Sequence, residues 1–378
     1  MRIRSTAAAA ALLLPLAAVF AIPATANATT TGTLYVNKMS AFCSDTSTTA
    51  GTSATPFCTI QAAANAATAG DTVEIFGGAA NAVVYAENVT ITHSGTAAAP
   101  ITFESIGRYT IIGEPFKTTA VTVQGADYVN LASLEADIVN IASSAHVSLS
   151  RSSVNEVNVE KGSSAVSVER DDIDSVSVAA GASDTVVAAN IIVSSTSTDG
   201  VSVVGATGTD VANNSIEIES GNGVYGAGIS VTGGASGTSV ENNILSGTPG
   251  TLPELLVDAS SASGTTEGYN LLDSTSSGAP YSWAGTGYTT VADFQAASGQ
   301  GTSDVLDDSF SDATSATLRT DDAPAVSSAN SAAPGLPATD YYGNPWTEYD
   351  RGASVLDHDP WAADRQAWDG IPIRGIGG

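Results

Sequence analysis

Aromatic residues and positive charge are scarce in this sequence. Only 6% of its 378 residues are aromatic, and 12 Lys and Arg stand against 39 Asp and Glu, for a formal net charge of −27. Nucleic acids and anionic membranes are poor partners for such a chain, because neither would gain counterion release from it. The lack of aromatics requires a core of small aliphatic side chains, which favours a thin, elongated interior.

Other absences exclude whole classes of structure. The 37 glycines show no three-residue period and there is no heptad tract, which excludes a collagen-like chain and a coiled coil. General disorder is disfavoured, because 43% of the residues are apolar and Val and Ile recur in short alternating runs. The chain can therefore build a core.

The N-terminus has the pattern of a secretory signal peptide, residues 1–28. Arg2 and Arg4 precede an apolar run, residues 7–22, and an A-x-A site ends at Ala28. The run is too short to span a bilayer comfortably, so we predict secretion to the extracellular space with no membrane span. Cleavage near Ala28 removes two basic residues, which leaves 10 basic against 39 acidic residues, a net charge of −29.

Secretion places the two cysteines in an oxidising compartment. A disulfide between Cys43 and Cys58 would close a loop of about 15 residues and stabilise the fold by roughly 3 kcal/mol. A catalytic thiol is the weaker alternative.

Two short strand patterns alternate at a regular interval between residues 121 and 257. Each is an apolar-polar-apolar triplet, which points two aliphatic side chains to one face. The same pattern returns every 18 to 29 residues, which is typical of a solenoid and predicts an all-β parallel β-helix. The first pattern has its anchors at Leu131, Leu149, Val168, Val187, Val211 and Val240, and the second at Val123, Ile141, Val159, Val178, Val203, Val231 and Val257.

The growth of the later coils is confined to one half of each coil. The step from the second pattern to the first is always 8 or 9 residues, whereas the other half grows from 10 to 16, 20 and 17. Insertions on one face of a solenoid often mark its binding face. Neutral loop drift remains an alternative, because loops accept insertions cheaply. The inserted stretches carry Glu254 and the substrate-binding candidates Asp199, Glu217, Glu219 and Tyr225.

A column of asparagines follows the first pattern. Asn190, Asn214 and Asn243 occupy equivalent positions in successive coils, which predicts a structural ladder in which each carboxamide donates to one neighbour and accepts from another. Asp171 occupies the same column one coil earlier. An ionised carboxylate cannot donate, so this position leaves an unmatched partner unless a cation or an arginine is adjacent.

The two ends of the chain differ from the repeat. Residues 59–69 predict a short helix with Thr59 as its N-cap and Gly70 as its C′ residue, which with the disulfide loop would plug the solenoid. Shorter first strands are expected at residues 73–76, 89–91 and 101–103. We divide the chain into the signal peptide (1–28), an N-terminal cap (29–72), the β-helix (73–272) and an irregular C-terminal cap or tail (273–378). Four tryptophans occur in that last part and are expected to cover the C-terminal end: Trp283, Trp346, Trp361 and Trp368.

The segments at both ends resemble a known family. Thr59-Ile60-Gln61-Ala62-Ala63 and Pro100-Ile101-Thr102-Phe103 are similar to the first coils of secreted right-handed parallel β-helix proteins of the pectate-lyase-like superfamily. Asp340-Tyr341-Tyr342-Gly343-Asn344-Pro345 resembles their closing segment of the choice-of-anchor type. The resemblance implies a right-handed parallel β-helix, but not one activity, because this fold hosts lyases, hydrolases, epimerases, adhesins and inert shafts.

The resemblance also implies candidate catalytic groups. The family's calcium-dependent lyases use carboxylates to hold Ca²⁺ and an Arg or Lys as base. By that resemblance Asp171, Asp172 and Asp174 are candidate Ca²⁺ ligands and Arg170, Arg151 and Lys161 are candidate bases. The motifs of the polygalacturonase-like branch are absent except for one Asp-Asp pair, Asp171-Asp172.

Two hypotheses follow. The first is a protein that binds an extracellular polysaccharide along a groove flanked by the inserted loops, and that cleaves it if it has a lyase-like or glycoside hydrolase-like activity. The second is a non-catalytic structural or adhesive shaft, in which Arg170 pairs with a neighbouring aspartate and the asparagines are ladder only.

Overall fold

The computed structural model describes most of the chain beyond the leader. The described residues are 32–78, 83–107, 110–113, 121–194, 198–218, 226–247, 253–273, 278–307, 325, 327–346 and 349–353. They all belong to the compact unit Thr31–Gly378, and the unit Met1–Thr30, with the predicted signal peptide, lies outside them. The all-β prediction is confirmed, and no described helix is long and apolar enough to cross a membrane.

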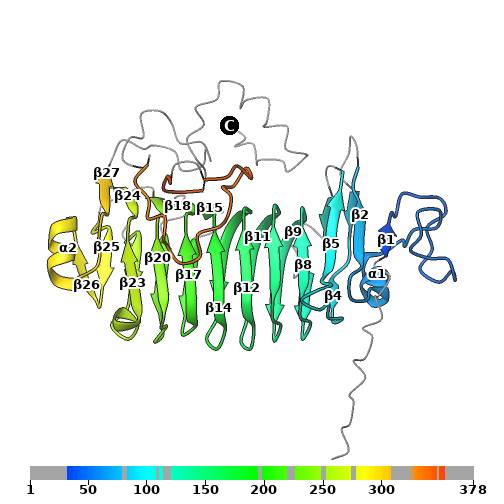
Figure 1. Ribbon diagram of the computed structural model, residues 1–378, viewed down its shortest axis with the longest axis horizontal. Coiled ribbons are helices and arrows are strands. Elements are labelled where there is room, and N and C mark those ends of the chain that lie inside the picture. Colours follow the sequence, from blue (N-terminus) through cyan, green and yellow to red (C-terminus); the bar gives the residue numbers. More distant parts are fainter. Residues whose placement is uncertain are drawn as a thin grey trace, which may run out of the picture. The chain divides into compact units, whose positions relative to one another are not determined.

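Ten parallel strands form one sheet, which we call sheet A. Neighbouring strands come from successive coils, so the coils stack at about 4.8 Å per rung. Figure 1 shows them side by side. In spatial order the strands are β1 (Thr33–Val36), β2 (Thr72–Phe76), β5 (Ile101–Ile106), β8 (Val129–Ala132), β10 (Val147–Ser150), β12 (Ser164–Glu169), β14 (Ser183–Ala188), β17 (Thr207–Ala212), β20 (Thr238–Glu241) and β23 (Thr265–Gly268).

The remaining strands form two further parallel columns, B1 and B2. Column B1 contains β3 (Val83–Tyr85), β6 (Thr110–Ile112), β15 (Ile191–Ser194), β18 (Ser215–Ile218), β21 (Ile244–Gly247), β24 (Leu271–Asp273) and β27 (Val305–Asp307). Column B2 contains β4 (Val89–Ile91), β7 (Val121–Gln124), β16 (Val201–Val204), β19 (Ile229–Thr232), β22 (Leu255–Val257) and β25 (Tyr281–Trp283). In three middle coils one long strand runs through both columns: β9 (Glu135–Ala142), β11 (Ser153–Val159) and β13 (Asp172–Val178).

Each coil thus has three strand positions, whereas the sequence analysis found two. The first pattern corresponds to sheet A and the second to column B2. Column B1 was missed. The inserted residues of the later coils lie in the sequence between a strand of column B1 and the following strand of column B2. They separate β15 from β16, β18 from β19, and β21 from β22. We call this edge the loop-bearing corner.

The core is one continuous stack of aliphatic side chains. Inward residues of the three columns, such as Leu149, Ile192 and Val203, are fully buried and belong to one hydrophobic cluster that runs from Val36 to Phe294. Burial of each such side chain contributes about 1.5–3 kcal/mol relative to exposure. The small aliphatic composition fits this narrow interior, which has room for few aromatic rings.

The corner between sheet A and column B1 has a repeated backbone conformation. From the coil of β8 to that of β23, the residue two places after the sheet A anchor has a positive φ, between 53° and 63°. This left-handed residue turns the chain, so that the residue after it points into the corner. The positions concerned are Ser133, Arg151, Arg170, Ala189, Asn213, Asn242 and Tyr269.

The N-terminal end is closed by helix α1 (Ile60–Ala66) and a disulfide. The Thr59 side chain accepts from the Ala62 N–H, and the Glu87 carboxylate accepts from two further N-terminal N–H groups. The helix is shorter than predicted, because Ala67 already has extended backbone, and Gly70 instead turns the chain into β2. Cys43 and Cys58 form the disulfide.

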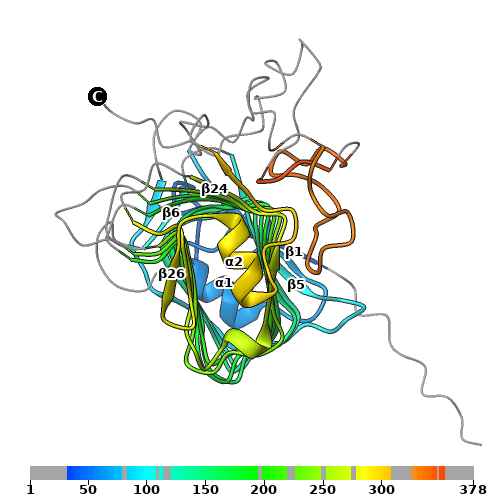
Figure 2. The same cartoon turned by 90° about the vertical axis from the view of Figure 1, so that its left-hand side faces the viewer.

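The parallel strands continue past residue 272, where the sequence repeat fades. Strands β24, β25 and β27 belong to further coils, and β26 (Thr286–Tyr288) and helix α2 (Val291–Ser298) close that end. Phe294 of α2 stacks on Tyr281 at 4.2 Å and meets Trp283 edge-on at 5.6 Å. Figures 1 and 2 place α1 and α2 at opposite ends of the stack. Trp361 and Trp368 lie outside the described residues.

A C-terminal segment, residues 325–353 in its described parts, packs along the outside of column B1. We call it the strap. Outward B1 positions are polar in the middle coils but apolar at Ile191, Ile244 and Leu271, and these are covered by Ala325, Tyr341 and Ala353 of the strap. In Figure 1 the strap is the orange segment beside β15 and β18. The change from polar to apolar outward residues explains why it docks there.

Polar contacts fix the strap. Arg351 is 2% exposed and donates to the carbonyls of Asn270 and Ser303 at 2.9 and 2.6 Å. Asn242 binds the Asn330 backbone twice, as acceptor and as donor, at 2.7 and 3.0 Å. The left-handed corner residues of the later coils thus hold the strap.

Substitution Gly352→Ala should loosen the strap. A Cβ there would lie 2.6 Å from Ile244 Cδ1, and the φ of Gly352 is +84°, so we expect a loss of about 1–3 kcal/mol and faster proteolysis within residues 325–353. Thermal unfolding and limited proteolysis measure both. The control is Gly247→Ala, which has open space for a Cβ. Equal behaviour of the two variants would contradict the role of this contact.

Candidate functional site

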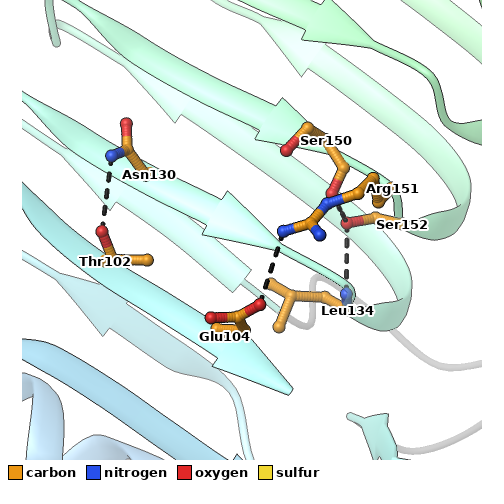
Figure 3. A network of polar contacts seen from close by, with 7 residues as sticks. All are labelled: Thr102, Glu104, Asn130, Leu134, Ser150, Arg151 and Ser152. Carbon is orange, nitrogen blue, oxygen red and sulfur yellow. Dashed lines mark hydrogen bonds and ion pairs between the residues drawn. The ribbon is translucent and has the colours of Figure 1, made fainter. Parts of the chain in front are cut away.

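The three predicted bases do not come together. Arg151 and Arg170 both occupy the left-handed position between sheet A and column B1. Arg151 extends over sheet A to the Glu104 carboxylate at 3.4 Å, as Figure 3 shows, and Arg170 donates to Thr339 Oγ1 of the strap at 3.3 Å. Lys161 lies beyond the end of β11, in the turn to sheet A beside Gly181. Structural contacts therefore occupy both arginines.

The three predicted Ca²⁺ ligands do not share one face. Asp171 is fully buried inside the corner, whereas Asp172 points outward near Tyr341 of the strap, whose pKa is raised by burial and then by the charge of Asp172. Asp174 follows Ile173, which pairs with Ile192, so it belongs to the outward row that continues to Val193 and Glu217. Within the described residues no three His, Cys, Asp or Glu side chains are grouped so as to hold a metal ion.

The buried column at this corner is a hydrogen-bond ladder. The backbone N–H of each rung donates to the side-chain oxygen of the next, at 2.7 to 3.1 Å. Each asparagine Nδ2 also donates to a strand carbonyl, as from Asn190 to Val168 at 2.9 Å. In Asn190, Asn214 and Asn243 it donates as well to the next carboxamide oxygen, as from Asn190 to Asn214 at 3.0 Å, whereas in Asn270 it donates to Glu267 Oε1 at 2.9 Å. The rungs are Ser152, Asp171, Asn190, Asn214, Asn243, Asn270 and Asp304, and Figure 3 shows the first, where Ser152 Oγ accepts from Leu134.

Asp171 is one of two carboxyl rungs, and it lies between Ser152 and Asn190, whereas Asp304 is the last described rung. Its Oδ1 accepts from the Ser152 N–H at 2.7 Å, but its buried Oδ2 has no hydrogen-bond partner. That oxygen occupies the place of an asparagine Nδ2, which faces acceptors at every later rung. Burial, with the charges of Glu169 and Asp172, raises the pKa of Asp171 well above its usual range, and Arg170 opposes this only in part. A neutral acid, with one O–H to donate, fits the position.

Substitution Asp171→Asn should stabilise the protein at neutral pH. The amide supplies the missing donor without a proton, so we expect a gain of about 1–3 kcal/mol in the free energy of unfolding. The folded pKa of Asp171 lies above its unfolded value near 4, so its contribution is fully present below about pH 4 and is lost as pH rises toward the folded pKa. The advantage of the variant should therefore grow with pH.

Urea unfolding at several pH values measures this advantage. The matched control is Asn214→Asp, which adds an acid to the ladder and should reverse the sign. A gain that is independent of pH between about 3 and 7 would contradict a neutral Asp171.

The loop-bearing corner gathers a different set of polar groups. Asp199 Oδ1 accepts from the Ala227 N–H at 2.7 Å, and Oδ2 accepts from the Ser230 hydroxyl of β19. This aspartate therefore ties one inserted stretch to the next coil. Glu219 and Tyr225 lie outside the described residues.

An outward row of carboxylates runs along column B1 at this corner. Val193 pairs with Glu217, Glu217 with Ser246, and Asp273 with Asp307, so these residues occupy one register position in successive coils. In the middle coils the same position is held by Asp137, Asn155 and Asp174, where Asn155 donates to the Asp137 carboxylate. We call this set the carboxylate row.

Glu254 lies against the carboxylate row and is 5% exposed. Its Oε2 accepts from the Asp273 N–H at 2.8 Å, while its buried Oε1 has no hydrogen-bond partner. Burial and then the charge of Asp273 raise the pKa of Glu254 well above its usual range. A carboxyl whose pKa is raised next to a second carboxyl group is one arrangement that general acid catalysis uses.

A polar strip accompanies the carboxylate row on column B2. Its outward positions are small amides and hydroxyls paired along the stack, such as Asn158 Nδ2 to Asn140 Oδ1 at 3.0 Å and Ser230 Oγ to Ser202 Oγ at 3.3 Å. These groups both donate and accept, as sugar hydroxyls do. The members are Thr122, Asn140, Asn158, Ser177, Ser202 and Ser230.

The sequence analysis missed Asp273 and Asp307 and gave Glu254 no role. Asp273 and Asp307 follow the apolar pairs Leu271-Leu272 and Val305-Leu306 of column B1. In each pair the first residue points outward and the second points into the core. Recognition of that third column would have placed both carboxylates on one row with Glu217. Asp273, whose N–H donates to Glu254, lies in the next coil, so no short sequence motif around Glu254 indicates this contact.

Comparisons with known proteins yield only distant likenesses. No protein-family model and no curated protein matches this chain. Similar solved structures include an alginate lyase from Paenibacillus sp. str. FPU-7, at 18% identity and a TM-score of 0.40 over 57% of this chain and 84% of that one. A GH136 lacto-N-biosidase from Eubacterium ramulus matches at 14% identity and a TM-score of 0.47, over 64% of this chain and 56% of its own. A rhamnogalacturonan lyase matches at 14% identity and a TM-score of 0.33, over 64% and 68%. At this level of similarity, function has to be argued from the residues of this chain.

Proposed function

We propose that this protein is a secreted right-handed parallel β-helix of the pectate-lyase-like kind that binds an extracellular polysaccharide. The polysaccharide would lie along a groove at the loop-bearing corner, between the carboxylate row and the polar strip of column B2. The leader-like N-terminus and the disulfide between Cys43 and Cys58 support secretion, because disulfides persist in oxidising compartments.

One observation carries the location of the site. The inserted stretches, the outward carboxylates and the unpartnered oxygen of Glu254 all occur at the same corner of the later coils. The A–B1 corner, which holds Arg170 and Asp171, is engaged by the strap and by the ladder. The repeating polar strip, with one rung about every 4.8 Å, suits an extended polymer better than a compact ligand.

Binding at this corner predicts that a bulky residue on the polar strip will block it. Substitution Ser202→Trp should weaken binding of the best glycan in a screen of pectate, alginate and plant-wall polysaccharides by more than tenfold, about 1.4 kcal/mol. Affinity electrophoresis or calorimetry measures it. The matched control, Ser167→Trp, places the same side chain on the outward face of sheet A. An equal loss of affinity in both variants would show that the glycan does not bind at this corner. If the protein binds none of the glycans, the alternative of a structural or adhesive shaft is favoured.

Glycan cleavage is a second candidate function, which the Glu254 carboxyl favours. A neutral carboxylic acid can protonate a departing sugar oxygen, and the adjacent Asp273 carboxylate can act as base or stabilise positive charge. This hydrolase-like chemistry fits the corner better than a lyase mechanism with an arginine or lysine base. The described residues that form this corner in four successive coils, 191–194, 198–204, 215–218, 226–232, 244–247, 253–257, 271–273 and 278–283, include no Lys or Arg.

Substitution Glu254→Gln should remove turnover and retain binding. General acid catalysis contributes about 10²–10⁴-fold, so we expect a loss of that size in the release of reducing ends. Because only the protonated Glu254 donates, the rate of the parent should fall as pH rises through its elevated pKa. The control Glu169→Gln, on sheet A, should cleave as the parent does. Cleavage by the Glu254 variant at the parent rate would contradict this role, and a parent without turnover on any glycan would leave a binding module.

A further inference from the structure

Two carboxyl groups share a buried position at the C-terminal end of the stack. Glu267 of β23 is 3% exposed, and Asp304, which precedes β27, is 8% exposed. The two carboxyls are hydrogen-bond partners. Asn270 Nδ2 also donates to Glu267 Oε1 at 2.9 Å, and the Tyr281 hydroxyl donates to Asp304 Oδ2 at 3.0 Å. Because a hydrogen bond between two carboxyls requires a proton on one of them, the pair is intact only while it holds at least one proton.

The groups that face this pair supply little positive charge. Tyr281 on β25 is a phenol, and its pKa is raised by burial and then by the charges of the pair and of Glu254. Arg351 of the strap is the described cation that acts on Asp304, but its guanidinium donates to two backbone carbonyls. Tyr269, at the adjoining corner, acts on Arg351. Burial therefore raises the pKa of both carboxyls, since two negative charges in this position would be poorly compensated.

The pair lies where three parts of the chain meet. We call α2 and the segment that follows it, residues 291–305, the end cap. Three backbone hydrogen bonds of 2.7 to 3.2 Å join residues 301–305 of the end cap to residues 267–270. The strap reaches both, because Arg351 donates to the carbonyls of Asn270 and Ser303. A change at the carboxyl pair therefore acts on the contacts that hold the end cap and the strap in place.

The last coil of a solenoid has a neighbouring coil on one side only, so it opens more easily than a middle coil. We propose that the Glu267–Asp304 pair is a pH-sensitive switch, which holds the end cap and the strap in place while it keeps a proton and releases both when the two carboxyls ionise. This device does not depend on glycan binding, and it makes the closed form the acidic form of the protein.

The direction of the pH dependence follows from the protonation of the pair. Burial raises the folded pKa values of both carboxyls above their unfolded values, which lie near 4. The contribution of the pair to stability is therefore fully present below about pH 4 and is lost as pH rises toward the folded pKa values. The end cap and the strap should be docked in acidic solution and open in alkaline solution.

Hydrogen exchange at about pH 5 and pH 9 tests the switch, with each rate divided by the intrinsic rate of a free amide at that pH. In the parent, the protection of residues 299–305 and of the described strap should fall together, by about tenfold or more relative to residues 147–159 of the middle coils. Protection that is unchanged at pH 9, or that falls equally in the middle coils, would overturn the proposal. A loss confined to the end cap would contradict its coupling to the strap.

Variants assign the effect to the pair. Glu267→Gln removes one titrating group and keeps an N–H donor for Asp304, so its end cap and strap should stay protected at pH 9. Asp304→Asn is a second variant with the same expectation. The matched control, Asp171→Asn, removes another buried carboxyl with a raised pKa, but from the ladder of a middle coil, and should open as the parent does. If both variants of the pair open as the parent does, or both melt below the parent at about pH 8, the switch is refuted.

Discussion

The fold depends on how it satisfies backbone N–H groups at the corner between sheet A and column B1. From the coil of β8 onward the chain turns through a residue with positive φ, and the next N–H is buried, where an unpaired donor would cost free energy. The ladder removes that cost, because the side-chain oxygen of one rung accepts the N–H of the rung before it, as between Asn214 and Asn190. Each rung thus requires the next, which fixes the stacking of the coils.

The ladder also explains why the rungs are not interchangeable. An asparagine accepts through Oδ1 and donates through Nδ2, so a run of asparagines satisfies itself except at its ends. Asp171 ends the run on one side, and Asp304 on the other, where Tyr281 donates to its free oxygen at 3.0 Å. Burial raises the pKa of both aspartates. Their surroundings differ, because Asp304 has the Tyr281 hydroxyl and the Glu267 carboxyl as hydrogen-bond partners, whereas Oδ2 of Asp171 has no hydrogen-bond partner in the protein.

The sequence predicts those parts of the fold in which the same short residue pattern returns in successive coils. Sheet A, column B2 and the asparagine column each return the same residue types in successive coils, so they can be aligned by eye. Column B1 cannot, because it is continuous with B2 in β9, β11 and β13 and its outward residues change from Ser153 and Asp172 to Ile191. That change depends on the strap, whose residues are distant in sequence from those they cover, as Asn330 is from Asn242 by 88 positions and Ala353 from Ser215 by 138.

Closeness in the sequence was also a poor guide to which side chains of the candidate site lie together. Arg170, Asp171, Asp172 and Asp174 are close in sequence, which suggested a common group. Arg170 is a left-handed corner residue and Asp171 is an inward rung, whereas Asp172 and Asp174 both point outward from β13. The four side chains are therefore divided among three environments although they are close in sequence. Conversely, Glu254 and Asp273 are 19 residues apart, yet one accepts from the backbone N–H of the other. In a solenoid, neighbours in space are one coil apart, and only the correct number of strands per coil reveals them.

The strap and the inserted loops divide the surface of the later coils between them. The strap covers the outward side of Ile191, Ile244 and Leu271 and the left-handed residues Asn213 and Asn242, so this side is occupied by the chain itself. The loops leave from the other edge of the same strands. In the later coils column B1 is therefore mostly apolar and covered at its first outward position, at Ile191, Ile244 and Leu271, whereas its third position carries Glu217, Asp273 and Asp307, only two residues away. A small shift in strand register would exchange core, strap and carboxylate positions, so the ladder that sets the register also determines where a ligand can bind.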